Sequence, residues 1–302
     1  MSAIVDEILF HEDPIFRDGI KAVIGGDTST LGALLEAHPR LVRQRSSSPH
    51  HATLLHYVAA NGVEDELQQT PPNAADIARQ LIDAGTEVDS VCDTYGGGSI
   101  QTTLNLLVSS EHPANAGVMV DIVRVLCEAG ARVDGVADDG SPLATGLGFG
   151  YPDAVGELLT HGARTNNLVF AAASGKLDSV QDYFADNGSI GPNVGRCVIK
   201  WFKMSPDPRV AGEQALVYAA MCGRNEVIEF LLDRGVDINS HPPATSVTAT
   251  ALHTAAWQGD SATVRLLLDR GADRMIVEPR YDSTARGWAQ HGGHEATAAL
   301  LG

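Results

Sequence analysis

Four side chains near the C-terminal end of the chain are of types that could do chemistry together: Trp257, Tyr281, Asp282 and His291. A histidine titrates near neutral pH, and a neighbouring carboxylate would orient its ring, so His291 and Asp282 could form an acid/base pair. Trp257 and Tyr281 would add an aromatic wall, which suits a small ligand or a side chain of a peptide. Whether these side chains meet depends on the elements that carry them.

The motifs of the common catalytic sites are missing from the chain. It has no phosphate loop of the form GxxxxGKS/T, no HExxH zinc motif and no GxSxG nucleophile motif. Its four cysteines form no CxxC pair, and its histidines show no metal-ligand spacing. We therefore expect no cofactor and no metal. His50 and His51 lie in the polar stretch SSSPHHAT, where we expect both rings to be exposed to solvent.

The composition is that of a folded, acidic chain. Hydrophobic residues make up 44% of its 302 residues, which is enough for a packed core, and its formal net charge is -17. A negative field repels polyanions, so we expect neither nucleic acid nor an anionic membrane surface as a partner. The acidic N-terminal stretch does not resemble a signal peptide, and the cysteines are unpaired, so we expect a cytoplasmic location.

Two short sequence patterns recur along the chain. The first is a leucine-rich helix end followed by glycine, as in RQLIDAG, VRVLCEAG, EFLLDRG and RLLLDRG. The second is a short apolar helix that also ends in glycine, as in TLLHYVAANG, LVFAAASG, ALVYAAMCG and ALHTAAWQG. Their alternation predicts units of helix, tight turn, helix and extended turn, several of them spaced at about 33 residues. One such helix pair cannot bury its apolar face alone, so neighbouring pairs must stack.

These patterns resemble ankyrin repeats. The segment ALHTAAWQGDSATVRLLLDRGAD departs little from that family, and the similarity covers most of the chain from about Leu54 onward. The resemblance implies an all-α, ankyrin-type solenoid of helix-turn-helix units with extended turn tips. It also implies capping helices in residues 1–50, with a helix pair over Ile15 to Leu41, and a repeat array in residues 51–302.

The same resemblance assigns structural roles to three polar residues. His56 and His253 match the histidine of the family that hydrogen-bonds between adjacent turns and is not a ligand. Asp282 matches a turn residue that caps the following helix. A structural role of Asp282 competes with its role in an acid/base pair.

Insertions interrupt the repeat period at four places, near residues 63–75, 93–101, 109–118 and 189–213. The stretches TYGGGSI and SSEHPANAGV predict flexible tips, and Pro71 and Pro72 exclude a helix around them.

The largest insertion carries the one basic and aromatic patch of the sequence. Its residues Arg196, Lys200, Lys203 and Arg209 interleave with Trp201 and Phe202. One interpretation is an extra helix, VIKWFKM, that packs Trp201 into the groove and leaves the lysines in water. The other is a contact surface for an acidic partner.

The resemblance also points to a binding surface. In this family the residues just before the glycine of the first helix face the concave groove and are normally polar, yet this chain has Phe149, Met221 and Trp257 there. Large apolar side chains that face water usually mark a binding surface. Trp257 and His291 occupy equivalent places in adjacent repeats, so these two residues should lie about 10 Å apart, which is the distance at which helices pack. The turn tips on the same edge would add polar partners, namely Tyr95, Asp138, Asp139, Arg280, Tyr281 and Asp282.

Two functions of different classes follow. The first is a non-enzymatic recognition module that binds a protein or peptide partner through the groove and the turn tips, and the acidic field favours a basic or mixed-charge partner. The alternative is a small-ligand-binding protein or an enzyme, in which the insertions close the groove over His291 and Asp282. The sequence does not decide whether the chain is an enzyme, although the resemblance favours recognition alone.

Overall fold

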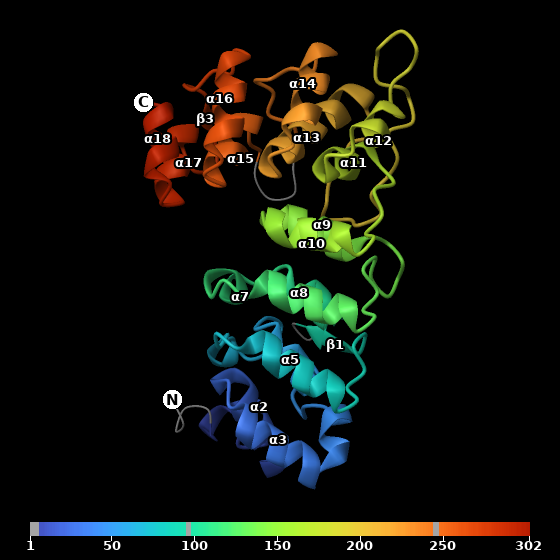
Figure 1. Cartoon of the computed structure of the whole chain (residues 1–302), viewed down its shortest axis with the longest axis vertical. Coiled ribbons are helices and arrows are strands. Elements are labelled where there is room, and N and C mark those ends of the chain that lie inside the picture. Colours follow the sequence, from blue (N-terminus) through green and yellow to red (C-terminus); the bar gives the residue numbers. More distant parts are fainter. Residues whose placement is uncertain (1–5, 95–97, 244–247) are drawn as a thin grey trace. The chain divides into compact units, whose positions relative to one another are not determined.

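The computed structural model describes residues 6–94, 98–243 and 248–302. Over these residues the chain is mostly helical, and it divides into two compact units, Met1–Ala163 (unit 1) and Arg164–Gly302 (unit 2) (Figure 1). In both units consecutive helices pair, with few short strands between them. The expected helix-turn-helix architecture is therefore confirmed.

Unit 1 consists of helix pairs whose members contact each other. They are α2 (Pro14–Gly25) with α3 (Thr28–Ala37), α4 (Leu54–Val58) with α5 (Ala74–Asp83), α6 (Thr103–Leu107) with α8 (Met119–Glu128), and α9 (Ser141–Phe149) with α10 (Pro152–Thr160). The first members, α2, α4, α6 and α9, contact one another in that order, and so do the second members. Two short 3-10 helices, η1 (Pro39–Arg43) and η2 (Asp65–Leu67), lie in the connections.

Unit 2 repeats this arrangement. Its pairs are α11 (Leu168–Ser174) with α12 (Leu177–Gln181), α13 (Pro208–Met221) with α14 (Asn225–Asp233), α15 (Ala251–Trp257) with α16 (Ser261–Asp269), and α17 (Ala285–His291) with α18 (Glu295–Leu300). The first helices α11, α13, α15 and α17 form one row of successive contacts.

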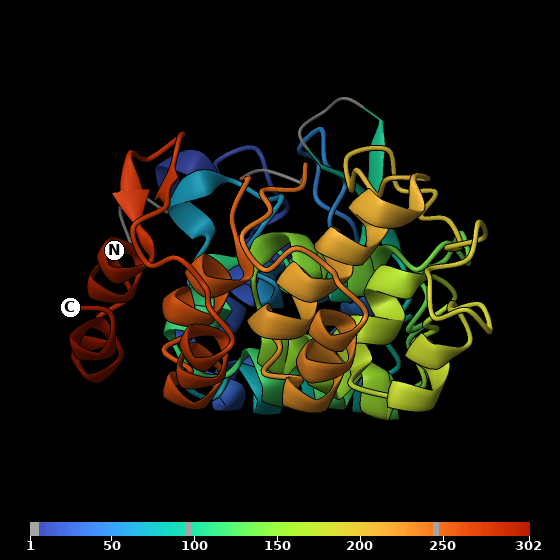
Figure 2. The same cartoon turned by 90° about the horizontal axis from the view of Figure 1, so that it is seen from above.

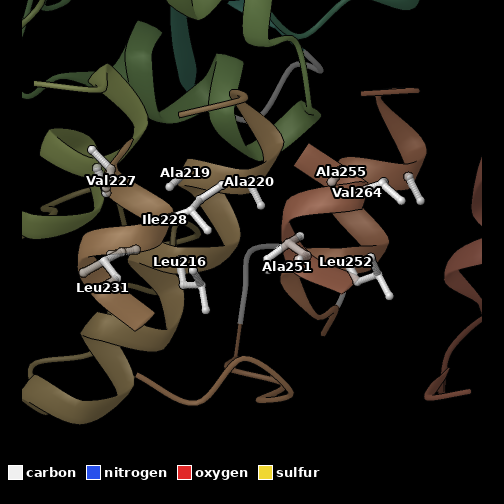
Figure 3. Packing of buried hydrophobic residues seen from close by; sticks show 14 of the residues in the cluster. Leu216, Ala219, Ala220, Val227, Ile228, Leu231, Ala251, Leu252, Ala255 and Val264 are labelled. Atoms are coloured by element: carbon white, nitrogen blue, oxygen red, sulfur yellow. The ribbon is translucent and has the colours of Figure 1, made fainter. Parts of the chain in front are cut away.

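The core of unit 2 explains why its first helices are rich in alanine. Ala219 and Ala220 on α13 and Ala255 and Ala256 on α15 have no exposed surface. Their small side chains let the two helices approach, while larger aliphatic side chains from the paired helices fill the space around them (Figure 3). A fully buried leucine or isoleucine such as Ile228 contributes about 1.5–3 kcal/mol by leaving water.

Two short antiparallel hairpins interrupt the helices. The strands β1 (Val91–Thr94) and β2 (Ser99–Thr102) pair in unit 1, and β3 (Val277–Glu278) and β4 (Ser283–Thr284) pair in unit 2. Figure 2 shows the β3–β4 hairpin standing clear of the helix ends.

Of the two insertions that were expected to form flexible tips, only one has its tip among the described residues. In TYGGGSI, Thr94 ends β1 and Ser99 begins β2, while Tyr95, Gly96 and Gly97 lie outside the described residues, so the tip there stays a prediction. The flexible tip predicted in SSEHPANAGV is wrong, because this stretch contains the short helix α7 (Glu111–Asn115). Strand pairing in the first case and local helical hydrogen bonds in the second satisfy backbone groups that an open loop would leave to water.

The extra helix predicted over VIKWFKM is wrong. The segment has no helix, and the insertion regains regular structure only at α13, where Asp207 caps the first turn by accepting from the backbone N–H of Val210 at 3.1 Å. The residue that packs inward is Phe202, which is 3% exposed, whereas Trp201 is 43% exposed. The ring of Phe202 stacks on Tyr218 with 5.3 Å between centroids, so side-chain packing rather than helix formation holds the segment.

Substitution of two glycines in unit 2 tests what the turns after the helices require of the backbone. Both Gly259 (φ +68) and Gly271 (φ +92) have left-handed backbones, but only at Gly259 would an added Cβ meet a neighbour, 2.5 Å from Nδ1 of His294. We expect Gly271→Ala to lower the free energy of unfolding by about 1 kcal/mol and Gly259→Ala to lower it by more. Urea unfolding followed by circular dichroism measures both losses. Equal losses would show that the contact with His294 adds no constraint.

Candidate functional site

Four aromatic rings meet at the C-terminal repeats of unit 2, and we call them the aromatic cluster: Trp257, Tyr281, Trp288 and His291. The Trp257 and His291 rings stack, with 5.7 Å between centroids and 22° between planes. Trp288 forms T-shaped pairs with Trp257 and with Tyr281, with 6.2 Å and 6.4 Å between the ring centroids. Such stacked and edge-to-face pairs are the favoured geometries of aromatic rings, so the four side chains support one another.

The helix ends of two neighbouring pairs position three of these rings. Trp257 is the last residue of α15, and Trp288 and His291 lie three residues apart on α17, so they share one face of that helix. Because α15 and α17 pack directly against each other, this face meets Trp257.

The fourth ring is held by a buried carboxylate. Glu278 is 1% exposed, and its two oxygens accept hydrogen bonds from the backbone N–H groups of Arg280 at 3.1 Å and Tyr281 at 2.9 Å. The guanidinium of Arg280 lies over the Tyr281 ring, 5.3 Å from its centroid. The turn between β3 and β4 is therefore fixed before any partner arrives.

The aromatic cluster remains open to solvent. Trp257 is 40% exposed and Tyr281 is 57% exposed, and His291 is exposed as well. An apolar surface of this kind, rimmed by the exposed Arg280 and Asp282, is the usual character of a contact site for another molecule.

His253 is buried beside the aromatic cluster and has the structural role that the resemblance implied. Its Nδ1 lies 2.8 Å from Oγ1 of Thr250 and its Nε2 lies 3.2 Å from the carbonyl oxygen of Ser283, so it connects α15 to the next turn. The ring also meets Trp288, with 5.3 Å between centroids. Burial lowers the pKa of His253 to about 4, so the neutral ring is the form that fits.

His56 makes the same contact with a threonine in unit 1, but its Nε2 is buried without a hydrogen-bond partner among the described residues. Its Nδ1 lies 2.8 Å from Oγ1 of Thr53, and its ring is fully buried. Burial lowers the pKa of His56 to about 4 as well.

The structure does not support the acid/base pair of His291 and Asp282. Among the interactions of the described residues, no hydrogen bond or ion pair joins the two side chains, and His291 is engaged by Trp257 instead. Asp282 is not the cap of the following helix either. Thr284 takes that place, since its Oγ1 accepts from the backbone N–H of Gly287 at 3.4 Å.

The other residues predicted for the binding surface lie on other elements of the two units. Met221 ends α13 and is half-buried. Phe149 ends α9 of unit 1 and is 54% exposed. Asp138 and Asp139 lie in the turn before α9, where Oδ1 of Asp139 accepts from the backbone N–H of Ser141 at 2.9 Å, and Tyr95 lies outside the described residues.

Trp288 is the one member of the aromatic cluster that the sequence analysis missed. Its spacing from His291 was a usable signal, because residues three apart on a helix share a face. Trp288 lies in the looser repeat copy TARGWAQHGG, three residues before His291, and His291 is the position equivalent to Trp257.

Unit 1 holds a buried polar cluster that the sequence analysis also missed. His50 is 8% exposed, so the expected exposure of its ring is wrong. Its Nε2 lies 3.1 Å from Oε1 of Glu64, the Ser48 hydroxyl donates to the same oxygen at 2.7 Å, and the Tyr57 hydroxyl donates to Oε2 at 3.1 Å. No sequence spacing links these residues, which come together only when the loop before α4 folds over the turn after it.

The polar cluster is built to hold a charged carboxylate. Burial alone would raise the pKa of Glu64, but hydrogen bonds from His50 and Ser48 outweigh it and lower that pKa to about 2. Burial, together with the charge of Glu64, raises the pKa of the Tyr57 phenol. Because both oxygens of Glu64 are occupied by these donors, its role is structural.

Over the described residues, no helix is both long and apolar enough to cross a membrane. Among the same residues, no group of three or more His, Cys, Asp and Glu side chains is placed to hold a metal ion.

Comparison with known protein families agrees with the helix pairs. A family model described as ankyrin repeats, in three copies, matches residues 168–278, which run from α11 to β3. The resemblance drawn from the sequence is confirmed for this part of the chain. No curated protein matches the chain.

The buried histidines predict an acid-dependent loss of stability. Their pKa is about 4 when folded and near 6.5 when unfolded, so between these values the unfolded chain binds more protons and the free energy of unfolding falls as the pH falls. Each histidine should contribute up to about 1.4 kcal/mol per pH unit in this window. Urea unfolding of wild type and His253→Gln at several pH values measures the slope. The variant should be less stable at pH 7 but show a shallower slope, and an unchanged slope would contradict the assignment.

Proposed function

We propose, from the ankyrin repeats that residues 168–278 contain, that this chain is a recognition module whose aromatic cluster binds a protein partner. The observation that carries the proposal is the stacked pair of Trp257 and His291. Trp257 keeps 40% of its surface exposed although it packs on His291 and against Trp288. A tryptophan held by neighbours in one orientation and still open to solvent is the typical centre of a protein interface.

The way the cluster is held favours tight binding. Glu278 fixes the turn that carries Tyr281, and the ring of Trp288 contacts the rings of both His253 and Trp257. Side chains that are ordered before binding lose little conformational freedom when the partner arrives, so less of the interaction energy is spent on ordering them.

The chemistry of the surface indicates the kind of partner segment. The rings offer an apolar face of the size that a leucine, methionine or aromatic side chain covers. The rim carries both Arg280 and Asp282 in exposed positions, and the whole chain is acidic, so a segment of mixed or basic charge around one large apolar residue fits best.

A set of three substitutions tests this proposal. Peptides selected from a random displayed library on the immobilised full-length chain should bind wild type, and Trp257→Ala and Tyr281→Ala should each weaken that binding by at least about tenfold, as hot-spot residues do. The matched control is Phe10→Ala, which removes an aromatic ring that is 77% exposed in unit 1. Fluorescence anisotropy gives the dissociation constants, and circular dichroism verifies that each variant is folded.

Two results would overturn the proposal. If the selected peptides bound all three variants as tightly as wild type, the aromatic cluster would not be the binding surface. If the Phe10→Ala control weakened binding as much as Trp257→Ala, the effect would not be specific to the cluster.

A further inference from the structure

A second exposed surface in unit 2 is locally positive in an acidic chain. Residues 196–204, which we call the basic-aromatic segment, contain Arg196, Lys200 and Lys203 and no acidic residue, in a chain whose net charge is -17. All three cationic side chains are exposed, and Trp201 between the lysines is 43% exposed. Arg209, further along the insertion, does not belong to this surface because it pairs with Glu213.

The segment is irregular, but its neighbours hold it in place. Phe202 lies between two rings, stacked on Tyr218 at 5.3 Å and edge-on to Phe170 at 5.6 Å. Phe202 thus anchors the segment at the residue directly between Trp201 and Lys203.

A buried amide fixes the backbone on the C-terminal side of this anchor. Gln214 of α13 is 2% exposed, and its Nε2 donates to the carbonyl oxygen of Lys203 at 2.7 Å. Its Oε1 accepts from the backbone N–H of Ser205 at 2.9 Å. The exposed tryptophan and the lysines beside it are therefore presented by a fixed backbone.

We propose that the basic-aromatic segment is a second docking site, separate from the aromatic cluster, and that it binds an acidic segment of a partner protein. The cationic side chains attract carboxylates of the partner, and the exposed face of Trp201 takes an apolar side chain that lies between them. Charge complementarity selects this occupant, because the segment carries three exposed cationic side chains and no acidic residue.

A nucleic acid fits these observations less well than an acidic protein segment. A polyanion extends well beyond a patch of a few cations, and the rest of its length would meet the field of an acidic chain. A short acidic stretch of a protein needs only the patch itself.

Charge reversal with a matched control tests the proposal. The probes are short fluorescein-labelled peptides in which several glutamates flank one leucine or one tryptophan, titrated with the full chain and followed by fluorescence anisotropy. The double variant Lys200→Glu/Lys203→Glu should weaken binding by about tenfold or more, and added salt should weaken the binding to wild type. Lys176→Glu/Arg265→Glu changes the net charge equally at two exposed positions of unit 2 outside the segment and should change affinity less than about twofold.

Two further variants separate attraction from repulsion and test the ring. Lys200→Gln/Lys203→Gln removes the positive charges without adding negative ones and should still weaken binding severalfold. Trp201→Ala should weaken it by about tenfold, while Phe10→Ala should not. Thermal unfolding verifies that each variant is folded.

Three binding results would overturn the proposal. The proposal is wrong if no acidic peptide binds wild type, or if the control double variant loses as much affinity as Lys200→Glu/Lys203→Glu. It is also wrong if a labelled single-stranded oligonucleotide binds the segment and the peptides do not, because the surface would then be a nucleic-acid site.

Discussion

The structure depends on one packing constraint, which is that a two-helix unit buries its apolar face only against its neighbours. In unit 2 this constraint is met by alanines such as Ala219 and Ala255, whose small side chains let α13 and α15 approach closely. Because the helices are close, the residues at their ends are close as well. The contact between Trp257 and His291 is a direct consequence, since each stands at the end of one of two helices in the same row.

The same constraint decides which features could be predicted from the sequence. The helix pairs could be predicted, because the glycine-ended helices and the leucine-rich helices repeat with little change, and the approach of Trp257 to His291 followed from their equivalent positions. The helix predicted over VIKWFKM and the flexible tip predicted in SSEHPANAGV were wrong, because repetition carries no information about insertions. Phe202 and Trp201 are adjacent and both large, and only the presence of Phe170 and Tyr218 in three dimensions shows that Phe202 is the one that packs inward.

The polar contacts were the least predictable, for a related reason. The His50 and Glu64 side chains meet although the helix α4 separates them in the sequence. A polar contact needs only one suitable atom within reach, so it leaves no periodic pattern in the sequence from which it could be predicted. The structural histidines are the exception. His56 and His253 follow a threonine by three residues in both units, and in both the threonine hydroxyl meets Nδ1 of the ring. The resemblance to ankyrin repeats assigned these two histidines a structural role, and the contact with the threonine accompanies it at the same spacing in both units.

In both proposed surfaces, a buried polar side chain holds an irregular segment by hydrogen bonds to its backbone. An irregular segment has backbone groups that no helix or sheet satisfies, and leaving them unpaired inside the protein costs about 1–3 kcal/mol each. Here a buried polar side chain from a neighbouring position takes them up: Glu278 accepts the backbone N–H groups of Arg280 and Tyr281, and Gln214 joins Lys203 to Ser205. Each segment thereby keeps one conformation while its aromatic side chain stays at the surface. The repeats provide the stability, and these buried carboxylate and amide groups convert loops that would otherwise be free to move into surfaces ordered in advance for a partner.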